Sequence, residues 1–101
     1  MTLTKYQKEV AALDQGEKDN LWYPCLGLAG EVGEVTEPIK KLYRDGRKLD
    51  KGHLALELGD VLWYLTCLAT RLDMRLEDIA GWNLKKLHQR QKDKEKAEKM
   101  I

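Results

Sequence analysis

The chain has 101 residues, 43% hydrophobic and 35% charged, with a formal net charge of +1, and this length supports a single compact domain over residues 1–101. The near-neutral charge excludes a strongly basic surface, and no apolar stretch approaches the length of a membrane span, so neither nucleic acid nor a membrane is expected as a partner. Because the start MTLTKYQKEV lacks the apolar region of a signal peptide, we expect a cytoplasmic protein with Cys25 and Cys67 as reduced core thiols.

Apolar residues recur at helical spacing in four segments, and a composition with two prolines and no phenylalanine favours an all-α fold. The first helix is expected to begin near Thr2 or Thr4 and to end before Asp14. The second is expected to begin at about Leu21 or Pro24 and to run to Arg44. Asp45 and Gly46 follow it as a left-handed helix end.

The third helix is expected to take Asp50 as its N-cap and to continue to Leu72, and the fourth to begin around Leu76. Residues 91–101 alternate in charge and carry few apolar side chains, so we expect a charged tail that is either a solvated helical extension or a frayed end.

The second and third helices repeat one pattern, LAGEVGEV at residues 28–35 and LALELGDV at residues 54–61. On a helical wheel, five apolar residues of each helix fall within about 40° of one line, which predicts the core stripe. These residues are Leu28, Val32, Val35, Ile39 and Leu42 in the second helix, and Leu54, Leu58, Val61, Leu65 and Leu68 in the third.

The acidic residues repeat at the same offset, since Glu31 corresponds to Glu57 and Glu34 to Asp60. Both pairs lie to the same side of the apolar line. The short link DGRKLDKG forces the two helices to be antiparallel neighbours, and an approximate two-fold axis then keeps equivalent flanks on one side of the pair. The pattern therefore predicts four carboxylates gathered on one side of a helix pair.

Four carboxylates gathered in this way need a positive partner, because two like charges about 5 Å apart repel by roughly 3 kcal/mol at an effective dielectric constant of about 20. Oxygen ligands favour Mg²⁺ first and Mn²⁺ second. Zinc is disfavoured because His53 and His88 are isolated. An acidic flank is also what any amphipathic helix shows, but the repetition, with Gly33 and Gly59 retained, favours a metal site.

Three motifs together resemble the all-α nucleoside triphosphate pyrophosphohydrolase superfamily, in its compact MazG-like branch. They are GLAGEVGEV as the E-x-x-E segment, ELGDVLWYL as the E-x-x-D segment and NLKKLHQR as the N-x-x-K-L-x-x-R segment. The resemblance covers roughly residues 21–90, which it implies are the catalytic core. It further implies a compact antiparallel domain of four to five helices, with a core like a four-helix bundle that oligomerisation completes. It also implies a homodimer or a pair of dimers in which a neighbouring subunit completes the active site.

The activity that the resemblance implies is hydrolysis of a nucleoside triphosphate to a nucleoside monophosphate and pyrophosphate, in nucleotide-pool housecleaning. By motif match, the catalytic Mg²⁺ ligands are Glu31, Glu34, Glu57 and Asp60, and the residues that face the nucleotide are Asn83, Lys86 and Arg90. The pattern leaves open which carboxylate is the general base. Lys86 and Arg90 are four residues apart on one helical face, which an ordinary solvated basic face would also show.

Aromatic residues near the acidic motifs are candidates for stacking on the base, chiefly Trp22 and Tyr64, with Tyr23 beside them. Trp63 and Trp82 are expected in the core or a subunit interface. The alternative to an enzyme is a non-catalytic nucleotide-sensing or helical interaction module of the same fold. A simple helical oligomerisation domain would explain the apolar stripes but not the matched carboxylates.

Overall fold

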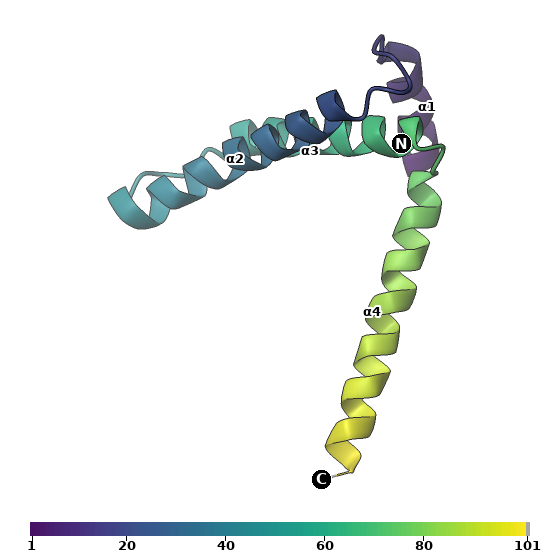
Figure 1. Cartoon of the computed structure of the whole chain (residues 1–101). Coiled ribbons are helices and arrows are strands. Elements are labelled where there is room, and N and C mark those ends of the chain that lie inside the picture. The colour runs from purple at the N-terminus through teal and green to yellow at the C-terminus, as the bar shows by residue number, and fades with distance from the viewer. Residues whose placement is uncertain (101) are drawn as a thin grey trace.

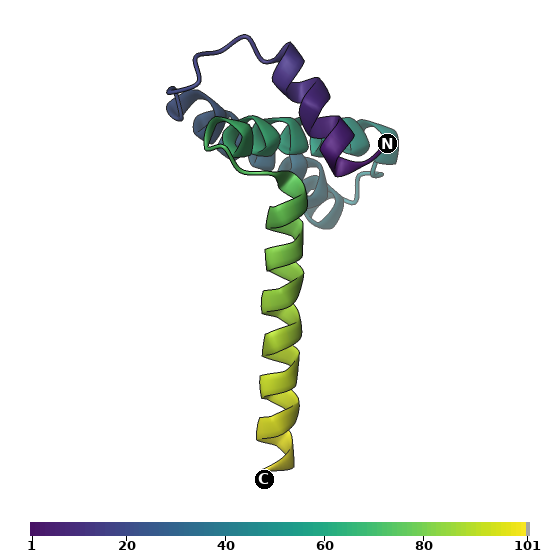
Figure 2. The same ribbon diagram turned by 90° about the vertical axis from the view of Figure 1, so that its right-hand side faces the viewer.

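The computed structural model describes residues 1–100 and confirms the all-α prediction, with four helices in that range (Figure 1). They are α1 (Leu3–Leu13), α2 (Trp22–Asp45), α3 (Lys51–Arg71) and α4 (Leu76–Lys99). α2 and α3 lie side by side as an antiparallel pair, α1 packs against α3 and the start of α4, and α4 extends away from the pair (Figures 1 and 2).

The helix ends follow the local signals in the sequence. The Asp50 carboxylate accepts a hydrogen bond from the His53 N–H, as expected for the N-cap of α3, and the Thr2 hydroxyl accepts one from the Lys5 N–H and caps α1. Gly46 ends α2 with a φ of 68°. α4 continues to Lys99, so the expected tail is a solvated helical extension, while Ile101 lies outside the described residues.

α1 is held in place by Val10, which is buried, and by the side-chain amide of Gln7. The Gln7 nitrogen donates to the Thr70 hydroxyl at 3.0 Å and to the Met74 carbonyl at 2.8 Å, and its oxygen accepts from the Leu76 N–H at 2.8 Å. One side chain of α1 therefore joins the end of α3 to the start of α4 and sets the direction in which α4 leaves.

The single chain is less compact than expected. Its radius of gyration is 17.7 Å, against about 13 Å for a compact domain of 100 residues. The cause is α4, in which every residue from Gly81 to Lys99 is exposed. The buried apolar residues instead gather where α1 crosses α3 and the start of α4, and they are Val10, Cys67, Ala69 and Leu76.

The predicted core stripe is split into two parallel lines. Half-buried residues recur every seven positions along the contact between α2 and α3, at Leu28, Val35 and Leu42 and at Leu54, Val61 and Leu68. The residues between them are exposed, at Val32, Ile39, Leu58 and Leu65. The expectation that these four lie in a core is wrong for the single chain, because two helices cover each other along only one line. A second apolar line is left without a covering layer.

One further expectation about burial needs correction. Cys67 is buried, but Cys25 is exposed, so only one of the two free thiols lies in the core. Pro24 is buried, and because successive helical residues point about 100° apart, Cys25 is turned toward the outer flank of α2. Trp82 is 61% exposed on α4, so of the two places expected for it the single chain excludes the core, and a subunit interface stays a prediction. Within residues 1–100, no helix combines the length and the apolar character that a bilayer crossing requires.

Candidate metal centre

Three carboxylates converge between α2 and α3. Glu31 from α2 and Glu57 and Asp60 from α3 each offer an oxygen atom, and these three atoms lie within 4.8 Å of one another. Glu57 and Asp60 are three residues apart and so share one face of α3. We call Glu31, Glu57 and Asp60 the acidic cluster. Glu34, the fourth predicted residue, is exposed one turn further along α2 and lies outside this group of three.

The acidic cluster is electrostatically unfavourable without a cation. Burial, together with the charges of Asp60, Glu57 and Glu34, raises the pKa of Glu31 above its ordinary value. The Oε2 atom of Glu31 is buried and accepts no hydrogen bond. Within the described part of the chain, no lysine or arginine forms an ion pair with the cluster, and its one basic neighbour is His53, whose Nε2 lies 3.3 Å from a Glu57 oxygen.

This donor set fits a hard divalent cation. Its three ligand atoms are all carboxylate oxygens, and no cysteine or histidine belongs to the group. A cation between them would give the buried Glu31 oxygen the partner that it lacks and would offset the like charges. Zinc would instead favour nitrogen or sulfur ligands, so the geometry agrees with the oxygen-ligand chemistry that the sequence predicts.

The three residues expected to face the nucleotide lie elsewhere in the single chain. Asn83, Lys86 and Arg90 are all exposed on the part of α4 that extends away from α2 and α3 (Figures 1 and 2). The structure therefore does not bring them to the acidic cluster within one chain. Lys86 and Arg90 share a face of α4 with Trp82, where they border a shallow hollow.

Of the three aromatic candidates, Tyr64 adjoins the acidic cluster, Tyr23 lies beside it and Trp22 is largely solvated. Tyr64 lies edge-on to Tyr23, with ring centroids 6.0 Å apart. Its neighbour Tyr23, burial and the nearby carboxylates of Glu31 and Asp60 raise the pKa of the Tyr64 hydroxyl. Trp22 is 77% exposed.

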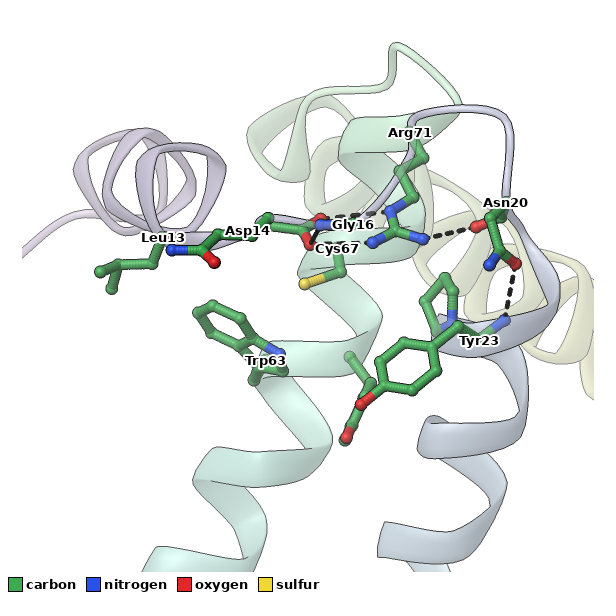
Figure 3. A pocket seen from close by; sticks show the side chains of 11 residues that line it. Leu13, Asp14, Gly16, Asn20, Tyr23, Trp63, Cys67 and Arg71 are labelled. Carbon is green, nitrogen blue, oxygen red and sulfur yellow. Dashed lines mark hydrogen bonds and ion pairs between the residues drawn. The ribbon is translucent and has the colours of Figure 1, made fainter.

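A pocket of about 430 Å³, which sequence reasoning missed, opens beside Tyr64 (Figure 3). Its upper wall is the loop between α1 and α2, held by Arg71 from the end of α3. The Arg71 guanidinium donates to both Asp14 carboxylate oxygens, at 3.1 and 2.8 Å, and to the Asn20 carbonyl. Asp14 and Arg71 are 57 residues apart, and nothing in the local pattern pairs them.

The ion pair fixes the charge state of this pocket wall. The hydrogen bonds from Arg71 hold the pKa of Asp14 below its ordinary value, so Asp14 is ionised at neutral pH. Burial raises the pKa of the Cys67 thiol in the same pocket to about 11. Cys67 therefore stays protonated at neutral pH and is not poised to act as a nucleophile.

Comparison with known proteins agrees with the motifs. The model of the MazG nucleotide pyrophosphohydrolase domain matches residues 24–94. The chain is 40% identical over 76 residues to the Gene 37 protein of Mycobacterium phage L5, a match that covers 71% of this chain and 67% of the phage protein. It is 34% identical over 99 residues to the Bacillus subtilis (strain 168) protein named "Uncharacterized protein YpjD", covering 92% of this chain and 89% of that protein. No solved structure matches it significantly. With its three motifs, its all-α fold and this match over most of its length, the chain belongs to the family of the MazG nucleotide pyrophosphohydrolase domain.

Proposed function

We propose that the protein hydrolyses nucleoside triphosphates between the α and β phosphates, giving a nucleoside monophosphate and pyrophosphate, with Mg²⁺ as cofactor and Mn²⁺ as a substitute. The observation that carries this proposal is the convergence of Glu31, Glu57 and Asp60 in a chain of the MazG family. The buried Glu31 oxygen without a protein partner supports it independently.

The acidic cluster and the substrate repel each other unless a cation intervenes, because a triphosphate brings about four negative charges. Bound Mg²⁺ would offset this repulsion and lower the pKa of a water molecule at the site. Glu31, Glu57 and Asp60 are the residues that would hold it. Glu34, exposed one turn from Glu31, would join them as a fourth ligand or would accept the proton of the attacking water.

The reaction forms one bond and breaks another at the α phosphorus. The water oxygen bonds to this phosphorus, the link to the β phosphate breaks, and pyrophosphate leaves with the bridging oxygen. Cationic side chains would stabilise the charge on the departing group. Lys86 and Arg90 have the right chemistry, but on the extended α4 they would reach the acidic cluster of another copy and not that of their own chain.

A homodimer, or a pair of dimers, is therefore part of the proposal. The second apolar line of α2 and α3, at Val32, Ile39, Leu58 and Leu65, is the surface that a second helical layer would cover. Such a layer would complete a four-helix bundle and would let Asn83, Lys86 and Arg90 approach a neighbouring site. We place this activity in nucleotide-pool housecleaning in the cytoplasm, where the free thiols Cys25 and Cys67 would remain reduced.

The direct test is to incubate the full chain with Mg²⁺ and each common ribo- and deoxyribonucleoside triphosphate, and to identify the products. We expect a nucleoside monophosphate and pyrophosphate from at least one substrate, with the activity lost on chelation and restored by Mg²⁺ or Mn²⁺. Release of a diphosphate and phosphate would contradict the proposal. Nucleotide binding without turnover across the whole panel would instead favour a nucleotide-sensing module.

A further inference from the structure

One continuous surface joins the acidic cluster to the pocket beside Tyr64. On α3, the residues Asp60, Tyr64, Cys67 and Arg71 follow at spacings of four, three and four, so they share one helical face. On α2, Tyr23, Gly27 and Glu31 do the same. Because an α-helix rises about 1.5 Å per residue, Tyr64 lies roughly 6 Å along α3 from Asp60. The pocket therefore begins about one helical turn from the acidic cluster.

The walls of this pocket suit a flat ring. Tyr23, Trp63 and Tyr64 line it with aromatic surface, and its volume of about 430 Å³ falls in the range of small-molecule sites. Figure 3 shows the rings of Tyr23 and Trp63 on two sides of the opening, with Cys67 above and between them. Aromatic side chains bind nucleobases by stacking, which stabilises each base by about 1–3 kcal/mol.

We propose that this pocket holds the base of the nucleoside triphosphate, and this inference rests on the proposed function. In a nucleotide, only the sugar separates the base from the α phosphate. A substrate whose α phosphate lies at the acidic cluster would thus bring its base to Tyr64 and into the pocket. The base would then be read by residues of the same chain that holds the cation, even though the basic residues of α4 come from another copy.

Asn20 is the residue that the geometry assigns to reading the edge of the base. Its side-chain oxygen accepts a hydrogen bond from the Tyr23 N–H at 3.1 Å, which leaves the amide nitrogen to donate. That nitrogen has no hydrogen-bond partner among residues 1–100. The charged groups beside it, Asp14 and Arg71, are hydrogen-bonded to each other. A carbonyl oxygen or ring nitrogen of the base is the acceptor that fits.

Gly27 sets the position of the Tyr64 ring that connects the pocket to the acidic cluster. A Cβ atom at Gly27 would overlap this ring, whereas a Cβ atom at Gly33 on the same helix would meet nothing within 4 Å. Gly27 therefore allows Tyr64 to lie directly against the backbone of α2. This close contact accounts for a glycine that would otherwise weaken the helix by about 1 kcal/mol.

The matched variants Gly27→Ala and Gly33→Ala test the role of the pocket, because both add one methyl group to α2. We expect Gly27→Ala to displace Tyr64 and to raise KM for the preferred nucleotide by roughly tenfold or more, the equivalent of one lost stacking contact. Gly33→Ala should leave KM unchanged. Titration of the apoprotein with Mn²⁺ should give the same affinity for both variants, which separates a pocket effect from damage to the acidic cluster.

The variant Asn20→Asp tests the reading of the base, since it keeps the oxygen that accepts from Tyr23 and removes the donating nitrogen. We expect the ratio of kcat/KM between the best and the poorest base to shrink by about tenfold or more, with Mn²⁺ affinity retained.

Hydrolysis and equilibrium nucleotide binding, measured in parallel, separate this inference from the proposed function. Turnover with unchanged KM in Gly27→Ala and unchanged base preference in Asn20→Asp would overturn the pocket assignment alone. Binding that Gly27→Ala weakens, without turnover of any nucleotide, would overturn the proposed function and support the pocket. If the wild-type chain bound no nucleoside triphosphate, both would be wrong.

Discussion

Asp60→Asn and Glu31→Gln are each expected to remove metal-dependent turnover while leaving the helices intact. Both substitutions keep the size of the side chain and delete one charged ligand of the acidic cluster. Changes in groups that merely orient a metal ligand typically cost about 10- to 100-fold in metal affinity or activity, so loss of a ligand itself should cost at least about 100-fold. The measurement is kcat/KM at saturating Mg²⁺, together with Mn²⁺ binding to each variant.

Glu31→Gln is expected to keep or raise the thermal stability of the apoprotein although it removes turnover. A carboxyl whose pKa is raised in the folded state disfavours the native structure at neutral pH, because folding holds its charged form in an unfavourable place. Glu31→Gln removes that charge, and the apoprotein is expected to melt at the same or a higher temperature than the wild type. Mg²⁺ should raise the melting temperature of the wild type and have much less effect on the variant.

Glu37→Gln is the matched control on the same helix. Glu37 lies on α2 beyond Glu34, and its carboxylate is paired with Lys40 and Lys41 at 3.4 and 3.9 Å. It should change neither turnover nor Mn²⁺ affinity. Full metal-dependent activity in Asp60→Asn or Glu31→Gln would exclude the acidic cluster as the cation site. An equal loss of turnover in Glu37→Gln would instead show that removing any negative charge from this part of the chain lowers activity.

The convergence of the carboxylates could be expected from the sequence because it depends on features that neighbouring residues determine. Asp50 and Gly46 fix the ends of the two central helices, the five residues between α2 and α3 force an antiparallel pair, and a repeated pattern places equivalent side chains on one flank. Glu31, Glu57 and Asp60 meet for these reasons. Whether Glu34 joins them depends on side-chain rotation and on a cation, which helical periodicity does not determine.

The pocket could not be expected in the same way, because it depends on contacts between distant residues. Arg71 binds Asp14 across 57 positions and thereby fixes the loop that carries Asn20. A helical wheel of α3 does place Asp60, Tyr64 and Arg71 on one face, but it cannot show that a loop covers that face. Likewise, periodicity finds the apolar stripe at Leu28 and Val32 without showing that Leu28 is half-buried while Val32 stays exposed.

The direction of α4 is the clearest case of a feature set by tertiary contacts. The link after α3 passes through Asp73, which has a φ of 56°, and α4 then leaves along the line fixed by the hydrogen bond from the Leu76 N–H to Gln7. The motif on α4 matches the family. Because of the direction of α4, however, its residues lie away from the acidic cluster of the same chain. This separation is the physical reason to expect a site shared between copies.

Arg71→Met is expected to lower the free energy of unfolding by about 3 kcal/mol, the lower end of the cost of breaking a buried ion pair. Only 4% of the Arg71 side chain is exposed, and it satisfies the Asp14 carboxylate and the Asn20 carbonyl together. Methionine would leave the Asn20 carbonyl without a partner and the Asp14 carboxylate with only the Gly16 N–H as a donor. Urea unfolding at pH 7 and fixed protein concentration measures the loss.

Lys18→Met is the control, because Lys18 forms an exposed ion pair with Asp73 whose loss should lower the free energy of unfolding far less than loss of the buried pair. The pH dependence gives a second check. The pKa of Asp14 is lowered in the folded state, so the stability it contributes is present above the ordinary aspartate pKa of about 3.9 and is lost as the pH falls through the lower folded value. The difference between the wild type and Arg71→Met should therefore narrow below about pH 4. If the two variants lost equal stability at pH 7, or if the difference stayed constant in acid, the Arg71–Asp14 pair would not be what holds the pocket loop in place.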